Sequence, residues 1–137
     1  MKSEINAPEE KRTRVMIVDD HAIVRAGLKR LIEEESDFTV CSEASDGPQA
    51  LEMLSADKPD IVIVDLGLPG MSGLDLIKNL LNREQTPRIL VISMYDESIY
   101  AERVLRAGAK GYLMKKESAE KVITALRRVR EGKLYVS

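Results

Sequence analysis

The stretch VMIVDD, Val15 to Asp20, decides the fold, because an uninterrupted apolar run ends abruptly in two carboxylates. Four consecutive apolar residues, three of them β-branched, are typical of a strand that is covered on both faces of a parallel sheet. The stretch IVIVD, Ile61 to Asp65, repeats the pattern. Ligands of such sheets bind outside the carboxyl ends of the strands. We therefore expect Asp19, Asp20 and Asp65 to meet at one edge of a sheet.

Further apolar runs extend this pattern along the chain. The candidate strands are Val15–Val18, Phe38–Cys41, Ile61–Val64, Ile89–Ile92 and Tyr112–Met114. Between them, apolar residues recur at helical spacing, as in Leu74, Ile77, Leu80 and Leu81. Strand followed by helix, repeated about five times, predicts an α/β fold in which helices cover both faces of a parallel sheet.

Polar residues and glycines mark the expected ends of the helices. Ser72, Asp96 and Ser118 each precede a helical segment and should cap its first turn. Gly108 and Gly132 fall where two helices should end.

Length and composition indicate one ordinary globular domain. The chain has 137 residues, a net charge of -2 and no polybasic block, which argues against a surface built to hold nucleic acid. Cys41 is the single cysteine, so an intramolecular disulfide is excluded and a reducing cytosol is compatible. No apolar stretch is long enough to cross a bilayer, so we expect a cytoplasmic protein that does not bind membranes. Residues 1–13 are polar and predict a flexible N-terminal extension.

The residues at the strand ends point to phosphate chemistry. Ser93 and Lys115 also follow candidate strands, so they should share the edge with the three aspartates. Carboxylate oxygens are the ligands that Mg²⁺ prefers in proteins. One carboxylate can attack phosphorus and become an aspartyl phosphate. The phosphoryl group brings about 1.5 to 2 negative charges, which Mg²⁺ and Lys115 would offset while Ser93 donates a hydrogen bond.

Four motifs together resemble the receiver domain of response regulators. They are VDD at 18–20, VDLGLPGMSG at 64–73, VISM at 91–94 and GAKGYLMK at 108–115, and the resemblance covers residues 14–132. The details DH at 20–21, SMYD at 93–96 and GKLYVS at 132–137 resemble the NarL/FixJ (LuxR-type) subfamily of two-component systems. The resemblance implies a flavodoxin-like, doubly wound (βα)5 fold whose five parallel strands have the order 2-1-3-4-5.

The same resemblance implies a role for each site residue. Asp65 would accept a phosphoryl group from the phosphohistidine of a sensor histidine kinase or from a small acyl phosphate. Asp20, Asp65 and the backbone carbonyl of Gly67 would ligate Mg²⁺, with Asp19 acting mainly through water. Ser93 and Lys115 would hold the phosphoryl oxygens. Tyr112 would follow Ser93 inward and repack the surface of the fourth helix, fifth strand and fifth helix.

The implied protein is a switch and not a metabolic enzyme, although it would catalyse its own phosphorylation and dephosphorylation. Residues 133–137 would begin a linker to a helix-turn-helix output domain that this sequence lacks. Contact with DNA, and hence control of transcription, would come only through that domain. The sequence leaves open whether phosphorylation produces a homodimer and through which face.

Some residues depart from the family pattern or invite another interpretation. Lys116 follows Lys115 where many receivers have a proline after a cis bond, and Gly67 has no side chain to orient an attacking water. His21, the only histidine, is interpreted as an exposed helix-start residue in preference to a metal ligand. Cations at Arg127, Arg128 and Arg130 suit the end of the last helix.

Three other functions fit the sequence less well than the switch does. A haloacid-dehalogenase-like phosphatase would carry a second aspartate two residues after its nucleophile, where this chain has Gly67. A flavodoxin-like cofactor binder is suggested only by Gly67, Gly70 and Gly73, while Pro69 and a missing lysine spoil the phosphate-binding patterns. An interaction domain independent of phosphorylation would not need the full acidic set.

Overall fold

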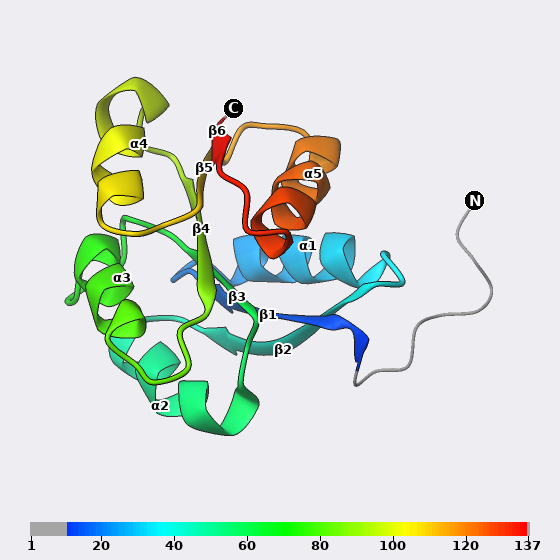
Figure 1. Cartoon of the computed structure of the whole chain (residues 1–137). Coiled ribbons are helices and arrows are strands. Elements are labelled where there is room, and N and C mark those ends of the chain that lie inside the picture. Colours follow the sequence, from blue (N-terminus) through cyan, green and yellow to red (C-terminus); the bar gives the residue numbers. More distant parts are fainter. Residues whose placement is uncertain (1–10, 137) are drawn as a thin grey trace.

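The computed structural model describes residues 11–136, which form six strands and five helices around a single sheet (Figure 1). The elements in chain order are β1 (Thr13–Val18), α1 (Ala22–Glu33), β2 (Phe38–Ala44), α2 (Gly47–Asp57), β3 (Ile61–Val64), α3 (Gly73–Leu81), β4 (Arg88–Ser93), α4 (Glu97–Arg106), β5 (Gly111–Met114), α5 (Ala119–Arg130) and β6 (Tyr135–Val136). Every strand pair is parallel, and the strand order is β2-β1-β3-β4-β5-β6. The predicted doubly wound α/β architecture is confirmed.

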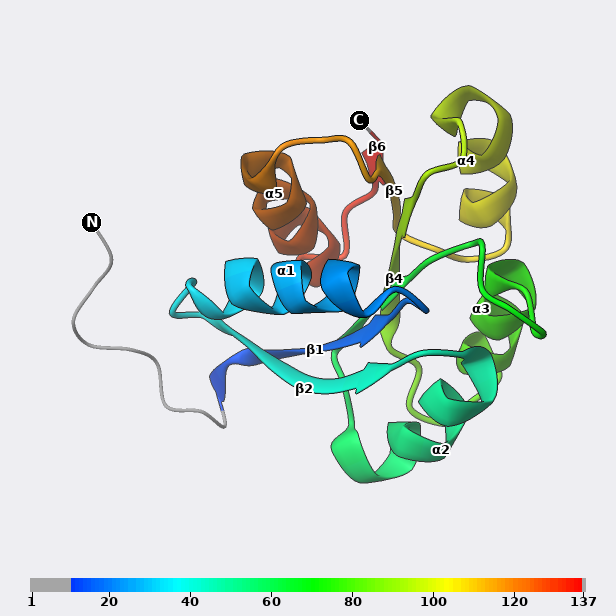
Figure 2. The same cartoon turned by 180° about the vertical axis from the view of Figure 1, so that it is seen from behind.

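Helices cover both faces of the sheet, which explains why its strands are apolar throughout. Helices α1 and α5 lie on one face and α2, α3 and α4 on the other, as the views from the front and from behind show (Figures 1 and 2). Along β1, Val15 and Ile17 pack in the core on the α1 and α5 side, whereas Met16 and Val18 pack on the opposite side. All four side chains are fully buried. An interior strand of this kind has no polar face, so its sequence does not alternate.

The predicted caps begin and end the helices as expected. Ser72 Oγ accepts a hydrogen bond from the backbone N–H of Asp75 (3.1 Å), and Ser118 Oγ accepts one from Lys121 (3.4 Å). Asp96 caps α4 by accepting from the N–H of Ser98 (2.8 Å). Each such cap contributes about 1 kcal/mol.

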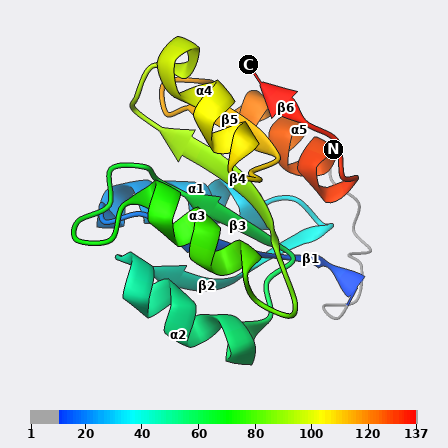
Figure 3. The ribbon, with the colours of Figure 1, turned by 60° about the vertical axis from the view of Figure 1, so that its left-hand side comes forward.

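The prediction of five strands is wrong by one, because β6 adds a short sixth strand beside β5. Tyr135 pairs with Gly111 and Val136 with Tyr112, and Figure 3 shows β6 at the sheet edge next to α5. Gly132, with φ of 81°, turns the chain back after α5. A Cβ at Gly111 would lie only 3.0 Å from the carbonyl oxygen of Tyr135, so glycine allows this close approach. Two residues are too few to show strand periodicity in a sequence.

The start of the chain and the loop after β5 bear on two further expectations. Residues 1–10 of the predicted N-terminal extension lie outside the described residues, while Thr13 already belongs to β1. Within residues 11–136 every peptide bond is trans, including the one between Lys115 and Lys116. No helix in the described part of the chain is long and apolar enough to span a membrane.

The arginines at the end of α5 bind acidic residues of the turn between α1 and β2. Arg127 Nη2 lies 2.7 Å from Glu35 Oε1, and Arg130 Nη1 lies 2.7 Å from Asp37 Oδ2. The Arg130 guanidinium also stands over the ring of Phe38, 4.9 Å from its centroid. These contacts tie the end of α5 to the turn between α1 and β2 and to the start of β2. The helix-dipole interpretation of the arginines did not include this role.

Asp37→Asn should therefore reduce stability in a pH-dependent way. Burial raises the pKa of Asp37, but hydrogen bonds from Arg130 and Arg127 outweigh it and hold the pKa below the ordinary 3.8. A lowered pKa stabilises the fold above pH 3.8, and this contribution is lost as the pH falls through the folded-state value. Because the carboxylate is partly exposed, we expect a loss below about 1 kcal/mol at pH 7. Urea unfolding should show a smaller difference from wild type near pH 3 than at pH 7; an equal difference at both pH values would contradict the assignment.

Candidate functional site

Three predicted site residues meet where β1, β3 and β5 end. Lys115 Nζ lies 2.8 Å from Asp19 Oδ2 and 3.2 Å from Asp65 Oδ2, so one ammonium group bridges two carboxylates. Asp19 and Asp65 are 3% and 5% exposed, although each is an ionisable residue. The parallel register of β1, β3, β4 and β5 places these strand ends side by side. The prediction that the strand ends converge is confirmed.

Fixed hydrogen-bond donors surround the two buried carboxylates. Asp19 Oδ1 accepts from the backbone N–H of His21 (2.9 Å), and Asp65 Oδ1 accepts from that of Gly67 (3.2 Å). Arg25 donates to the backbone carbonyl of Asp19 (2.6 Å), which fixes the loop after β1. Among the described residues, no buried side-chain nitrogen or oxygen lacks a partner. Hydrogen bonds from the backbone thus hold both carboxylates in place.

Lys115 supplies the positive charge of this pocket. Burial lowers the pKa of its ammonium group, but the hydrogen bond to Asp19 and the charges of Asp65 and Asp19 raise it more, to above the ordinary value of 10.5. The side chain is 13% exposed. Lys115 is therefore charged at neutral pH and directed at both carboxylates.

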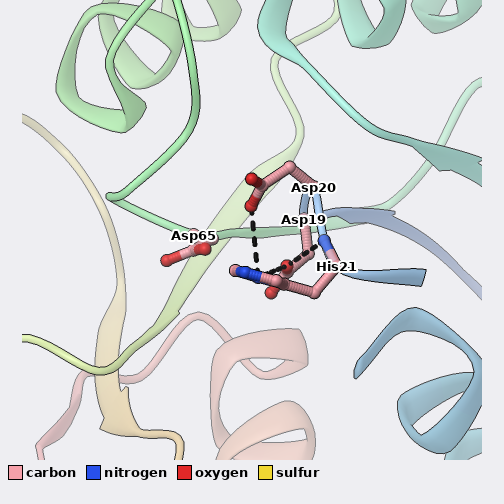
Figure 4. A group of neighbouring side chains, drawn as sticks. All are labelled: Asp19, Asp20, His21 and Asp65. Carbon is pink, nitrogen blue, oxygen red and sulfur yellow. Dashed lines mark hydrogen bonds and ion pairs between the residues drawn. The ribbon is translucent and has the colours of Figure 1, made fainter. Parts of the chain in front are cut away.

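Asp20 and His21 complete a cluster of four possible metal-ligating side chains (Figure 4). His21 Nδ1 lies 3.1 Å from Asp19 Oδ1 and 3.2 Å from Asp20 Oδ1, and the figure shows both carboxylates turned towards the imidazole. One ligand atom from each of Asp19, Asp20, His21 and Asp65 lies within 4.8 Å of the others. Octahedral coordination at about 2.1 Å places neighbouring ligands about 3 Å apart and opposite ligands about 4.2 Å apart. The three carboxylates of this set fit a divalent cation such as Mg²⁺, which prefers oxygen ligands.

His21 occupies the predicted place but makes contacts that the sequence analysis missed. Its ring is 60% exposed and it stands at the N-cap of α1, as expected for a helix-start residue. Its side chain makes no capping hydrogen bond and turns back to the aspartates instead. The only sequence signal for these contacts is that His21 directly follows Asp20.

Ser93, Tyr95 and Tyr112 form a second hydrogen-bonded group beside the cluster. Ser93 Oγ accepts from the backbone N–H of Tyr95 (3.1 Å), and the Tyr112 hydroxyl donates to the backbone carbonyl of Tyr95 (2.6 Å). Tyr112 is fully buried, and burial raises the pKa of its phenol, so the hydroxyl remains a donor. The backbone N–H of Lys115 donates to the carbonyl of Ser93 (2.9 Å), which joins this group to the end of β5.

Tyr95 also reaches over the loop that follows β3, a contact with no signal in the sequence. A Cβ built on Gly67 would lie 3.4 Å from the Tyr95 hydroxyl and 3.9 Å from Asp65 Oδ1. Gly67 itself is exposed. The aromatic side chain therefore occupies space that a larger residue at position 67 would fill.

The fold and the cluster define a class: doubly wound α/β domains with an acidic pocket and a lysine at the carboxyl edge of a parallel sheet. The family model described as the response regulator receiver domain matches residues 15–127. The chain belongs to this family. The match includes the carboxyl ends of β1, β3, β4 and β5, where the cluster lies.

Curated relatives agree with this membership. The chain is 32% identical over 136 residues to the transcriptional regulatory protein DegU of Brevibacillus brevis, covering 99% of this chain and 56% of that protein. It is 37% identical over 124 residues to the oxygen regulatory protein NreC of Staphylococcus carnosus, covering 90% and 57%. The chain thus spans a little more than half the length of these relatives.

Solved structures give the same result at the level of the fold. A LuxR-family two-component response regulator from Aurantimonas sp. SI85-9A1 superposes with a TM-score of 0.85 at 35% identity, covering 90% of this chain and 89% of that one. The receiver domain of the putative response regulator NarL from Mycobacterium tuberculosis gives 0.84 at 32% identity, covering 90% and 99%. The expected similarity to LuxR-type receivers is confirmed.

Proposed function

We propose that this chain is a phosphorylation-dependent receiver domain in which Asp65 accepts a phosphoryl group. The observation that carries the proposal is the contact of Lys115 Nζ with both Asp19 Oδ2 and Asp65 Oδ2. When a buried carboxylate that is paired with an ammonium becomes phosphorylated, the negative charge moves to the phosphoryl oxygens. These oxygens can then pair with the lysine, so the ammonium keeps a partner. The proposed donor is the phosphohistidine of a sensor histidine kinase or a small acyl phosphate.

In the proposed reaction, a carboxylate oxygen of Asp65 attacks phosphorus and forms the new P–O bond. The bond between phosphorus and the donor, P–N in phosphohistidine or P–O in an acyl phosphate, breaks, and its electron pair stays with the donor. An imidazole donor then takes a proton from solvent, whereas a carboxylate leaving group needs none. Asp65 requires no general base because it reacts as the carboxylate. Lys115 and the Ser93 hydroxyl hold the transferred oxygens.

We assign Mg²⁺ to the acidic cluster as the cofactor of this reaction. Asp20, Asp65 and the carbonyl of Gly67 would ligate it, with Asp19 acting through water. When bound, the ion offsets negative charge on the phosphoryl oxygens. Asp19 Oδ2 stays with Lys115, which keeps the ammonium directed at the phosphoryl position.

The proposed output passes through Ser93 and Tyr112 to the surface of α4, β5 and α5. The Tyr112 hydroxyl donates to the backbone carbonyl of Tyr95, and the backbone N–H of Tyr95 donates to Ser93 Oγ. Movement of Ser93 would therefore shift Tyr95 and with it the hydrogen bond that holds the Tyr112 ring. A shift between two packed arrangements of this kind is a common form of switching. By analogy with its longer relatives, we propose that the surface controls a DNA-binding output domain and thereby transcription.

The proposal is tested by measuring intact mass after incubation with acetyl phosphate. We expect one phosphoryl adduct per chain with Mg²⁺ and little or none when EDTA replaces the metal. An adduct that forms equally well in EDTA contradicts the assigned cofactor. Sustained hydrolysis of simple phosphate monoesters would instead indicate a phosphatase.

Truncating Tyr95 should shorten the lifetime of the phosphoryl group. The Tyr95 hydroxyl would lie 3.4 Å from a Cβ on Gly67, and the same Cβ would lie 3.9 Å from Asp65 Oδ1. We therefore propose that the ring restricts the approach of water to this side of Asp65. We expect Tyr95→Ala to hydrolyse about three- to tenfold faster, equivalent to about 0.7 to 1.4 kcal/mol in the barrier. The hydrogen bonds of Tyr95 to Ser93 and Tyr112 use backbone atoms and survive the truncation.

The lifetime is followed by the decay of the adduct mass after the donor is removed. Tyr95→Phe keeps the ring and is the matched control, so it separates shielding by the ring from hydrogen bonding by the hydroxyl. If Tyr95→Ala decays at the wild-type rate, Tyr95 has no part in the lifetime.

A further inference from the structure

The backbone of Asp19 is held from both sides by the end of β2. Its N–H donates to the carbonyl oxygen of Ala44 (3.1 Å), and its own carbonyl oxygen accepts a hydrogen bond from Arg25 Nη1 (2.6 Å). Arg25 Nε in turn lies 3.5 Å from Glu43 Oε1. Because Glu43 and Ala44 are the last two residues of β2, this strand braces the loop between β1 and α1, in part through one arginine side chain.

An arginine is suited to this double contact. The side chains of Arg25 and Glu43 are 19% and 33% exposed, so their interaction is screened less than that of a pair at the open surface. The planar guanidinium presents its donors at fixed angles, so Nη1 serves the carbonyl while Nε faces the carboxylate. A lysine has one nitrogen and cannot occupy both positions. Since the hydrogen bond uses a backbone oxygen, it leaves the carboxylate of Asp19 to its other contacts.

The hydrogen bond from Arg25 fixes more than one oxygen atom. The Asp19 carbonyl belongs to the planar peptide unit that joins Asp19 to Asp20, so holding this oxygen orients the whole plane. The plane in turn helps to set the direction in which the Asp20 side chain leaves the backbone. The Asp19 carboxylate has a further anchor in Lys115 Nζ (2.8 Å). Asp20 is exposed, so its direction depends more on the backbone.

We propose that Arg25 is a positioning residue for phosphoryl transfer to Asp65. It acts by holding the peptide unit between Asp19 and Asp20, with Glu43 as its anchor. The inference rests on the proposed function, and it assigns Arg25 no contact with phosphate or metal. A purely structural arginine would only attach α1 to β2, as Lys29 does with its Nζ 3.8 Å from Glu43 Oε2.

Amide hydrogen exchange, followed by NMR without metal or phosphoryl donor, tests the brace itself. The amide of His21 is the reporter, because it donates to Asp19 Oδ1 (2.9 Å) and therefore senses the geometry of the loop. We expect it to exchange about three- to tenfold faster in Arg25→Ala, which loses the hydrogen bond to Asp19. Lys29→Ala is the matched control, because it removes a positive charge beside Glu43 and leaves that hydrogen bond in place. Its reporter amide should exchange as in the wild type.

Titration with Mg²⁺ tests the effect of the brace on the reaction. We expect Arg25→Ala to need about tenfold more Mg²⁺ both for half-saturation in calorimetry and for the half-maximal rate of adduct formation from acetyl phosphate. The rate at saturating Mg²⁺ should return close to that of the wild type, because no group that touches the reacting atoms is lost. Arg25→Lys should need an intermediate concentration, and Lys29→Ala should match the wild type. Urea unfolding measures the stability of each variant separately.

The results separate failure of this inference from failure of the proposed function. If Arg25→Ala and Lys29→Ala lose stability alike, while reporter exchange and Mg²⁺ dependence stay at wild-type values, Arg25 is only structural and the positioning role is wrong. Faster exchange with an unchanged Mg²⁺ dependence also overturns that role. In both cases a normal adduct in the wild type leaves the proposed function intact. A wild type that forms no adduct overturns the proposed function, and the positioning role with it.

Discussion

Replacing Asp65 by asparagine is expected to abolish the phosphoryl adduct that acetyl phosphate and Mg²⁺ produce in the wild type. The amide has nearly the same shape as the carboxylate but is a far poorer nucleophile, so we expect the rate to fall by roughly a hundredfold or more. Asp65 is 5% exposed and its charge faces Lys115, so both the nucleophile and the partner of the ammonium change in one substitution. Intact mass over a time course gives the rate.

Asp75→Asn is the matched control, because Asp75 is an exposed aspartate in the first turn of α3. The Asp75→Asn variant also loses one carboxylate, but we expect it to form the adduct as the wild type does. Circular dichroism of both variants establishes that the fold is retained. An adduct formed by Asp65→Asn at the wild-type rate and yield would show that another residue is the acceptor.

Among substitutions of glycine by alanine near the site, we expect Gly73→Ala to reduce stability and the rate of phosphorylation the most. A Cβ at this position would lie 2.5 Å from the carbonyl oxygen of Asp65 and 2.6 Å from Cα of Leu66. Both contacts are with backbone, so the start of α3 or the loop after β3 must move. Overpacking of this kind costs roughly 1 to 3 kcal/mol. Because the displaced backbone carries Asp65, we also expect slower phosphorylation in the variant.

Urea unfolding and the rate of adduct formation measure the two parts of this prediction. Gly27→Ala is the control, because a Cβ at position 27 meets no heavy atom within 4 Å and Gly27 lies inside α1. In a helix, glycine to alanine should stabilise the protein by about 0.5 to 1 kcal/mol. Wild-type stability and rate in Gly73→Ala would mean that the loop adapts without cost.

Most of the fold could be predicted because its strands are fully covered. In a strand such as Val15 to Val18 both faces pack against helices, so every residue is apolar. The composition alone therefore indicates a buried strand. The second strand was harder: β2 extends to Ala44, and several of its later residues are only half-buried. β6 could not be predicted from two residues, because its pairing depends on the missing side chain of Gly111 on another strand.

The predicted site residues divide in the same way. Asp19, Asp65 and Lys115 come together because the register of the parallel strands brings their backbone positions to one edge of the sheet. The contacts of Tyr95 with the Gly67 loop and of His21 with two carboxylates depend on how side chains turn once the loops are packed. A sequence gives the neighbours of such residues along the chain, but not the directions in which their rings point.

The sixth strand changes which part of the sheet other molecules can reach. With β6 in place, β5 has a paired neighbour on each side, and the outer hydrogen-bonding edge next to α5 belongs to Tyr135 and Val136. Leu134 and Val136 are exposed there, at 56% and 47%. A molecule that approaches between α4 and α5 therefore meets these apolar side chains before it meets β5. Recognition of the proposed switching surface of α4, β5 and α5 would therefore depend on Leu134 and Val136 as well as on β5 itself.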